Sequence, residues 1–219
     1  MEYQSVFNKV ANYKELHVYQ KSDVLVVVTD IFCRRFLPPY GDRTVDQMNM
    51  AARCGKQNIV EGSEAAMTSS ETELKLVNVG RSSFQELRED YEDYLKKHGL
   101  PLWDINHPRY DKMLEFCRKH NKVTDYQWLA ETLDAEPLCN MCITLCHITD
   151  RMFFNYLKYL ERLFVERGGI KERMHAARTG YRQGVDQRLK QLEQENHQLR
   201  EELQRLREAT SADRTGSPS

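Results

Sequence analysis

Hydrophobic residues recur along most of this chain at alternating spacings of three and four, the pattern of amphipathic α-helices. The pattern is clearest between Asp42 and Ala66, where one line of positions carries Val45, Met48, Ala52, Gly55, Ile59 and Gly62. Half of that line is Ala or Gly, and small residues let a partner helix approach closely. We therefore expect a central helix packed tightly against its neighbour, where the small residues Gly80, Ser82 and Ser83 of the next helix form the matching patch.

Three further segments carry the same periodicity, at residues 13–36, 70–99 and 138–167. The run VLVVV in the first of these is interpreted as helix, because no second strand is available to pair with it. The fold class is accordingly all-α. We expect these segments to pack as a helical bundle over residues 1–167.

Capping residues predict where several helices begin. Asp42 is the expected N-cap of the second helix. Ser70 with Glu73, and Thr124 with Gln127, fit capping boxes.

Residues 100–137 are less regular and predict a short helical insertion packed on the end of the bundle. We expect one short helix from about Pro108 to His120 and a second one from Thr124. Trp103 and Trp128 are the expected packing residues.

The chain continues after the bundle with segments of different composition. Residues 168–184 read as a basic linker, in which Gly180 and Gly184 are expected to interrupt the helix. That interruption argues against a leucine-zipper transcription factor, which needs a continuous basic helix. Residues 185–209 predict a coiled coil, and residues 210–219 have the composition of a disordered tail.

The coiled-coil segment keeps strict heptad spacing. Its predicted core is Val185, Leu189, Leu192, Asn196, Leu199, Leu203 and Leu206. The flanking pairs are all of opposite charge: Arg188–Glu193, Glu195–Arg200 and Glu202–Arg207. Such pairs suit two identical chains lying parallel and in register, and Asn196 at an a position favours two strands. The alternative is an amphipathic helix that folds back on the bundle.

Composition narrows the class of protein. Net charge is −1 with 30% charged residues, so no global basic field indicates nucleic acid. No apolar run approaches the length of a membrane span, and the first residues lack the apolar core of a secretory signal. The six Cys are then expected to be reduced thiols. We expect a cytoplasmic protein.

A row of polar residues follows the second and third helices: Gln47, Asn58, Glu61, Ser83 and Glu86. It predicts either a binding cluster or a buried polar network between these helices, and the structural interpretation is favoured. Glu61 and Glu86 alone make a weak case for acid–base catalysis. We expect no catalytic residues.

The sequence CNMCITLCH places Cys139, Cys142 and Cys146 on one helical face, next to His147. A metal site would need four converging ligands, so Cys117 or His120 would have to complete it. The other interpretation is that these thiols are small apolar core residues. No cofactor is expected under that second interpretation.

Positive charge is concentrated around the linker, at Arg167, Lys171, Arg173, Arg178 and Arg182. These side chains are candidate contacts to nucleic-acid phosphates. A segment of this kind is more often simply a solvated hinge.

Several motifs in order resemble a known family: residues 15–21 (ELHVYQK), Gln47 with Ala51-Ala52, residues 58–62 (NIVEG) and residues 83–87 (SFQEL). The chain resembles bacterial four-helix-bundle proteins encoded by intervening sequences in ribosomal RNA genes. It is also similar to the accessory variability protein of diversity-generating retroelements. The resemblance implies an antiparallel up-and-down four-helix bundle, assembled into a homopentameric ring. For the retroelement protein it also implies binding of nucleic acid and a reverse transcriptase. Where the family has a basic pair, this chain has Asn49-Met50.

Two functional hypotheses follow. The first is a non-enzymatic homo-oligomeric scaffold that binds a macromolecular partner, RNA or DNA or an enzyme acting on them such as a reverse transcriptase. The second is a metal- or cofactor-binding bundle built on the Cys cluster. We expect a bundle-driven ring, with the coiled coil secondary to it.

Overall fold

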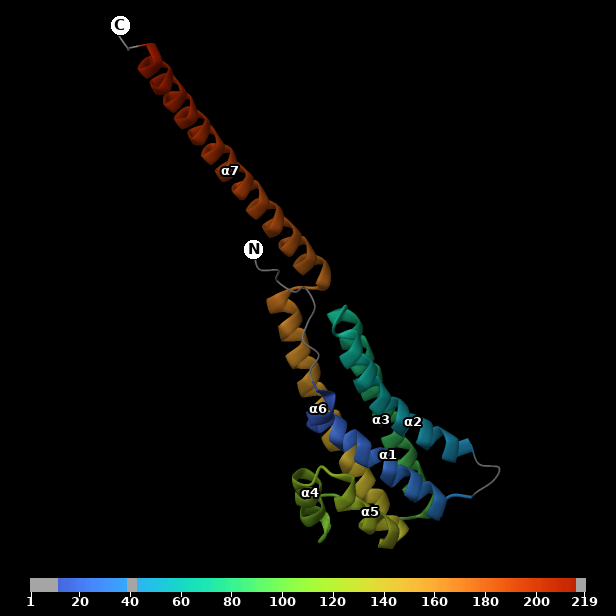
Figure 1. Cartoon of the computed structure of the whole chain (residues 1–219). Helices are drawn as coiled ribbons and strands as arrows, with labels where there is room; N and C mark the ends of the chain where they lie inside the picture. The colour runs from blue at the N-terminus through green and yellow to red at the C-terminus, as the bar shows by residue number, and fades with distance from the viewer. Residues whose placement is uncertain (1–11, 39–42, 216–219) are drawn as a thin grey trace. The chain divides into compact units, whose positions relative to one another are not determined.

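The computed structural model describes residues 12–38 and 43–215, with side chains to Arg207. Every element in these ranges is a helix, as predicted (Figure 1). The chain divides into two compact units, with the boundary between Ile170 and Lys171. Among the described residues, no helix combines the length and the apolar character that crossing a bilayer demands.

The larger unit contains a 3₁₀ turn and six α-helices: η1 (Tyr13–Glu15), α1 (His17–Phe36), α2 (Arg43–Ala65), α3 (Ser70–His98), α4 (Tyr110–Lys119), α5 (Val123–Thr132) and α6 (Ala135–Arg167). Helix α1 packs against α2 and α6, and α3 packs against the same two helices. These four helices share one hydrophobic core. The short helices attach to it at two places, α5 on α1 and α4 on α6.

The small-residue line of α2 lies in the interior, as predicted. Met48, Ala52, Gly55, Ile59 and Gly62 are all buried. Gly80 of α3 sits directly against it, because a Cβ on Gly80 would lie 2.9 Å from the backbone oxygen of Gly55. A Cβ on Gly55 would in turn overlap the ring of Phe84. Glycine at position 80 therefore allows the two backbones to come this close, and glycine at position 55 leaves room for the Phe84 ring.

Helix ends differ in detail from the expected caps. The N-cap of α3 is Ser69, whose hydroxyl accepts from the Thr72 backbone N–H at 3.1 Å, so the predicted Ser70 box is wrong. Helix α5 starts at Val123, and Asp125 accepts from the backbone N–H of Lys122 at 3.2 Å. The expected Thr124 box is therefore also wrong. Asp42 lies outside the described residues.

The insertion is held by a buried lysine that sequence analysis did not single out. The Lys21 ammonium, which is fully buried, donates to the backbone oxygens of Cys117 and His120 at the end of α4. It also lies 3.1 Å from the Tyr126 hydroxyl of α5. Burial lowers the pKa of Lys21 to about 8, although the nearby Asp125 acts in the opposite direction.

The two tryptophans of the insertion have different surroundings. Trp103 is 7% exposed, whereas Trp128 is 68% exposed, so only the first is a packing residue. The Trp103 indole N–H donates to Glu136 of α6 at 2.8 Å.

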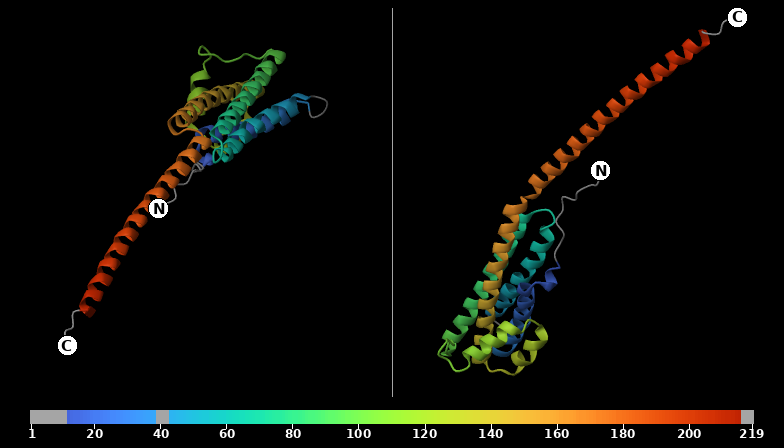
Figure 2. Two further views of the ribbon diagram at one scale, coloured as in Figure 1. Left: turned by 90° about the horizontal axis from the view of Figure 1, so that it is seen from above. Right: turned by 90° about the vertical axis from the view of Figure 1, so that its left-hand side faces the viewer.

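The smaller unit is dominated by one helix, α7 (Ile170–Thr215). Figure 2 shows it as an unbroken ribbon. Gly180 and Gly184 lie within its bounds. The chain is non-helical only at Gly168 and Gly169 between α6 and α7. The expected interruption at Gly180 and Gly184 is therefore wrong. The tail expected to be disordered from residue 210 is helical as far as Thr215, and residues 216–219 lie outside the described ranges.

Candidate functional site

Among the described hydrogen bonds, none joins the polar residues of α2 to those of α3. Gln47, Glu61 and Glu86 are exposed. The Asn58 amide donates to the Cys54 backbone oxygen at 2.8 Å, and the Ser83 hydroxyl donates to the Val79 backbone oxygen at 3.2 Å. Each hydrogen bond stays within its own helix. The predicted buried network between the helices is therefore wrong, whereas the predicted binding cluster stays a prediction.

The thiols of α6 are core residues. Cys139, Cys142 and Cys146 are buried, whereas His147 beside them is exposed. The Cys139 thiol donates to the Tyr91 backbone oxygen at 3.2 Å. Burial raises the pKa of Cys142 to about 12 despite a hydrogen bond with Tyr91, so the group stays a neutral thiol.

A cysteine binds a metal ion as a thiolate, and burial in the core disfavours this charged form of the α6 cysteines. Within the described ranges no group of three or more His, Cys, Asp or Glu side chains is placed to hold a metal ion. The metal hypothesis for Cys139, Cys142, Cys146 and His147 is therefore not supported by the fold. The burial of the three cysteines supports the alternative interpretation, in which they act as small apolar residues of the core.

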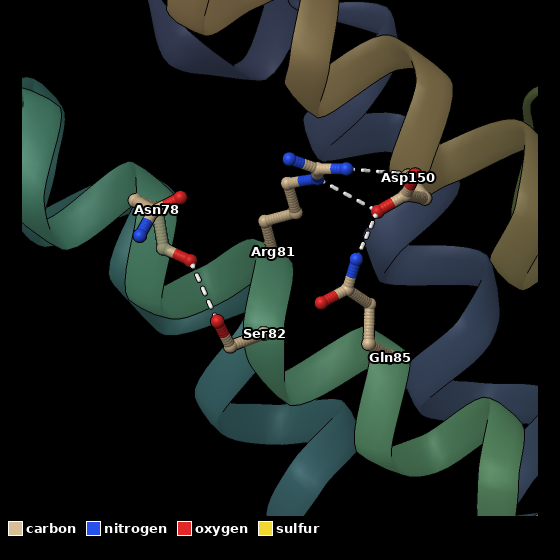
Figure 3. A network of polar contacts seen from close by, with 5 residues as sticks. All are labelled: Asn78, Arg81, Ser82, Gln85 and Asp150. Atoms are coloured by element: carbon tan, nitrogen blue, oxygen red, sulfur yellow. Dashed lines mark hydrogen bonds and ion pairs between the residues drawn. The ribbon is translucent and has the colours of Figure 1, made fainter.

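Helices α3 and α6 are joined by a polar network that sequence analysis missed (Figure 3). The Arg81 guanidinium donates to both carboxylate oxygens of Asp150, at 2.7 and 3.2 Å, and the Gln85 amide donates to the same carboxylate at 2.9 Å. Partial burial alone would raise the pKa of Asp150, but Arg81 and Gln85 hold that pKa below its ordinary value. The network is an ion-paired clamp between the two helices.

Next to this clamp, cations surround one aromatic ring. The Lys158 ammonium lies 4.5 Å from the Phe154 ring centre, and the guanidinium carbons of Arg81 and Arg151 each lie 5.6 Å from it. A hollow of about 350 Å³ opens here, with Glu161 as an acid among its lining residues. We call Arg81, Arg151, Phe154 and Lys158 the basic aromatic patch. Arg151, Phe154 and Lys158 follow helical spacing, so this part was visible in the sequence.

A second hollow, of about 510 Å³, lies between the insertion and α6. Its lining is mostly apolar, and Arg118, His147 and Arg151 add basic groups to it. Asn140 shapes it by accepting from the Trp103 backbone N–H at 2.7 Å and donating to the Pro101 backbone oxygen at 3.0 Å. Partial burial of the imidazole, together with the nearby Arg88, lowers the pKa of His147, which favours the neutral form.

The heptad residues of α7 form a stripe along the exposed surface of the helix. The apolar members are exposed by 42% to 61%: Val185, Leu189, Leu192, Leu199, Leu203 and Leu206. Asn196 in the same line is also exposed.

The predicted basic residues fall on different elements. Arg167 ends α6, and the other four lie on α7, where Lys171, Arg178 and Arg182 are exposed and Arg173 is half-buried. They are not gathered in a flexible linker, because α7 is helical throughout this stretch.

No family model matches this chain, and no curated protein or solved structure matches it at a significant level.

Proposed function

We propose that this chain is a non-enzymatic scaffold that self-associates through α7 as a parallel coiled coil. In this proposal it presents basic surfaces to a macromolecular partner, RNA or DNA or an enzyme acting on them such as a reverse transcriptase. The observation that carries the proposal is the exposed stripe of Val185 and five leucines on one helix.

The stripe supplies a driving force for association. Burying a leucine side chain stabilises by roughly 1.5–3 kcal/mol. Soluble monomers rarely expose contiguous apolar surface of this kind without a partner that covers it. A second copy of α7 has the matching stripe at the same spacing.

Charge complementarity favours the parallel, in-register pairing of two copies. Arg188 and Glu193, Glu195 and Arg200, and Glu202 and Arg207 occupy g and following e positions, so each pair brings opposite charges together between chains. An antiparallel pairing would bring like charges such as Glu195 and Glu202 together. Asn196 at a lies in the middle of the stripe, where buried amides in both chains hydrogen-bond and select two strands.

The bundle offers less apolar surface for a ring. Its exposed large hydrophobic residues are scattered along the sequence, among them Met50, Val79, Ile105 and Trp128. We therefore reverse the order expected from the sequence: self-association through α7 comes first, and a pentameric ring of bundles is secondary to it.

The up-and-down antiparallel topology implied by the family resemblance is also part of the proposal. Supporting it, Gly62 near the end of α2 adjoins Val77, and the earlier Gly55 adjoins Phe84. The order of contacts along α3 is thus reversed relative to α2.

On the bundle, the surface best suited to an anionic partner is the basic aromatic patch. Arg81 is partly neutralised by Asp150, whereas no acidic partner is found for Lys158 and Arg151 among the described ion pairs. A ring flanked by cations is typical of surfaces that stack on exposed bases and contact phosphates.

Sedimentation velocity tests the self-association. We expect the full chain to be a dimer, and the double variant Leu192→Glu/Leu199→Glu to be monomeric because four carboxylates would meet in the pair. The matched control is Gln187→Glu/Gln194→Glu, which adds the same charge at f positions outside the stripe and should remain dimeric. A Leu192→Glu/Leu199→Glu variant that keeps the wild-type mass would refute the proposal.

A further inference from the structure

The heptad register of α7 does not stop at Val185. Counting back through the continuous helix, the a and d positions fall on Arg182, Arg178, His175 and Lys171, at spacings of three and four. The line that carries leucines towards the C-terminus therefore carries cations towards the N-terminus. We call Lys171, His175, Arg178 and Arg182 the basic arm.

The two glycines do not disturb this line. Gly180 occupies an f position and Gly184 a c position, both away from the seam. A Cβ on Gly180 would meet nothing within 4 Å. The helix passes through both residues, so the arm is a rigid continuation of the coiled coil.

In a parallel pair the arms cannot pack as the leucines do. Arg182 of one chain would face Arg182 of the other across the seam, and Arg178 would face Arg178. Like charges in contact repel, so the two helices must diverge N-terminal to Val185. A polyanion placed between or beneath the diverging arms would neutralise both.

We propose that the α7 pair binds duplex DNA, with one basic arm of each chain in the major groove on either side of the dimer axis. This inference rests on the proposed self-association. A continuous helix that forks from a parallel coiled coil across the major groove is a known geometry for such an arm. The groove is about 12 Å wide and admits an α-helix.

The length and chemistry of the arm fit this partner. The helix rises about 17 Å between Lys171 and Arg182, on the order of five base pairs of B-form DNA. Arg178 and Arg182 can contact phosphates or guanine edges, and Lys171 adds a third full charge to each arm. Duplex RNA fits poorly, because its deep, narrow major groove does not admit the arm.

Fluorescence anisotropy with a labelled 30-base-pair duplex DNA of mixed sequence tests the inference, using the full chain at several salt concentrations. We expect Arg178→Gln/Arg182→Gln to weaken binding at least tenfold at low salt. It should also reduce the slope of log K against log salt by about 3 to 4, since four phosphate contacts are lost per dimer. The matched control is Lys190→Gln/Arg205→Gln, which removes equal charge from b and c positions and should change affinity less than threefold.

Sedimentation of the same samples separates the two proposals. If the protein is a dimer but does not bind DNA, or binds it equally well with and without Arg178 and Arg182, DNA binding by the basic arm is refuted and the proposed self-association stands. A duplex RNA of the same sequence bound as tightly as the DNA also refutes the major-groove assignment. A chain that stays monomeric refutes the proposed function and this inference together.

Discussion

Glu73 has the most strongly shifted pKa among the Asp and Glu side chains that the structure describes. Its side chain is buried on α3, and the Tyr156 hydroxyl of α6 donates to its carboxylate at 3.3 Å. Burial raises the pKa of Glu73 from its ordinary value near 4.5 to about 7, against the opposing effect of the Tyr156 hydrogen bond.

This shift predicts a pH dependence of stability. Between pH 4.5 and pH 7 the folded state keeps a proton that the unfolded state has released. The free energy of unfolding therefore falls as pH rises through this window, by up to about 3 kcal/mol from this group. Glu73→Gln removes the ionisable group, so the free energy of unfolding of this variant should fall less than that of the wild type over the same pH window.

Urea denaturation of both proteins across this window measures the effect. Other carboxyl groups contribute equally to the two proteins, so the difference between their curves isolates Glu73. The stability of Glu73→Gln relative to wild type should rise by about 2–3 kcal/mol from the acidic to the neutral end. Parallel curves across the window would show that Glu73 titrates normally when folded.

At this scale, sequence analysis recognised residue types but not their surroundings. Glu73 was expected to cap α3, since it follows Ser70 by three residues, but its burial depends on Tyr156 of α6, which is distant in the sequence. Lys21 was likewise part of a motif without a role, because its carbonyl partners lie in the insertion. Such contacts between remote segments leave no local pattern in the sequence.

Among the elements, α2 and α3 show what periodicity does predict. The small-residue line identified the buried face of α2 and its mate Gly80, because close backbone approach needs residues without bulk. The predicted polar network between these helices was wrong because helical spacing shows which residues share a face but not what packs against that face. Gln47 and Glu61 follow such a line, yet solvent lies opposite them. The Arg81–Asp150 clamp joins two helices and could not be read from either one.

Gly80→Ala tests the contact between α2 and α3. The added Cβ would lie 2.9 Å from the Gly55 oxygen and 3.1 Å from the Asn58 Cβ, so the helices must move apart. We expect a net loss of about 1–2 kcal/mol, because overpacking costs more than the helix propensity of alanine returns.

The matched control is Gly180→Ala on α7, where the new Cβ meets nothing within 4 Å. There we expect no loss, and a gain of up to about 1 kcal/mol from helix propensity. Thermal melts followed by circular dichroism compare the two variants. A Gly80→Ala protein as stable as wild type would mean that α2 and α3 are not in close contact.

For the whole molecule, the sequence predicted the all-helical class and the heptad stripe but misjudged the connection between bundle and stripe. Gly180 and Gly184 were read as breaks, since glycine lowers helix propensity. In a long helix with good formers on both sides, two separated glycines are tolerated. That continuity places the cations and the leucines of α7 in one register, which composition alone did not reveal.

The central claim is that two copies of α7 lie parallel and in register. Oxidative cross-linking of Leu203→Cys in a Cys54→Ser background tests this most directly, since the other native cysteines are buried. Leu203 lies near one end of the stripe, so two copies of residue 203 meet only in a parallel pair. We predict rapid formation of a disulfide-linked dimer by Leu203→Cys and little by the f-position control Gln194→Cys. Equal cross-linking of the two variants, or none by Leu203→Cys, would contradict the account.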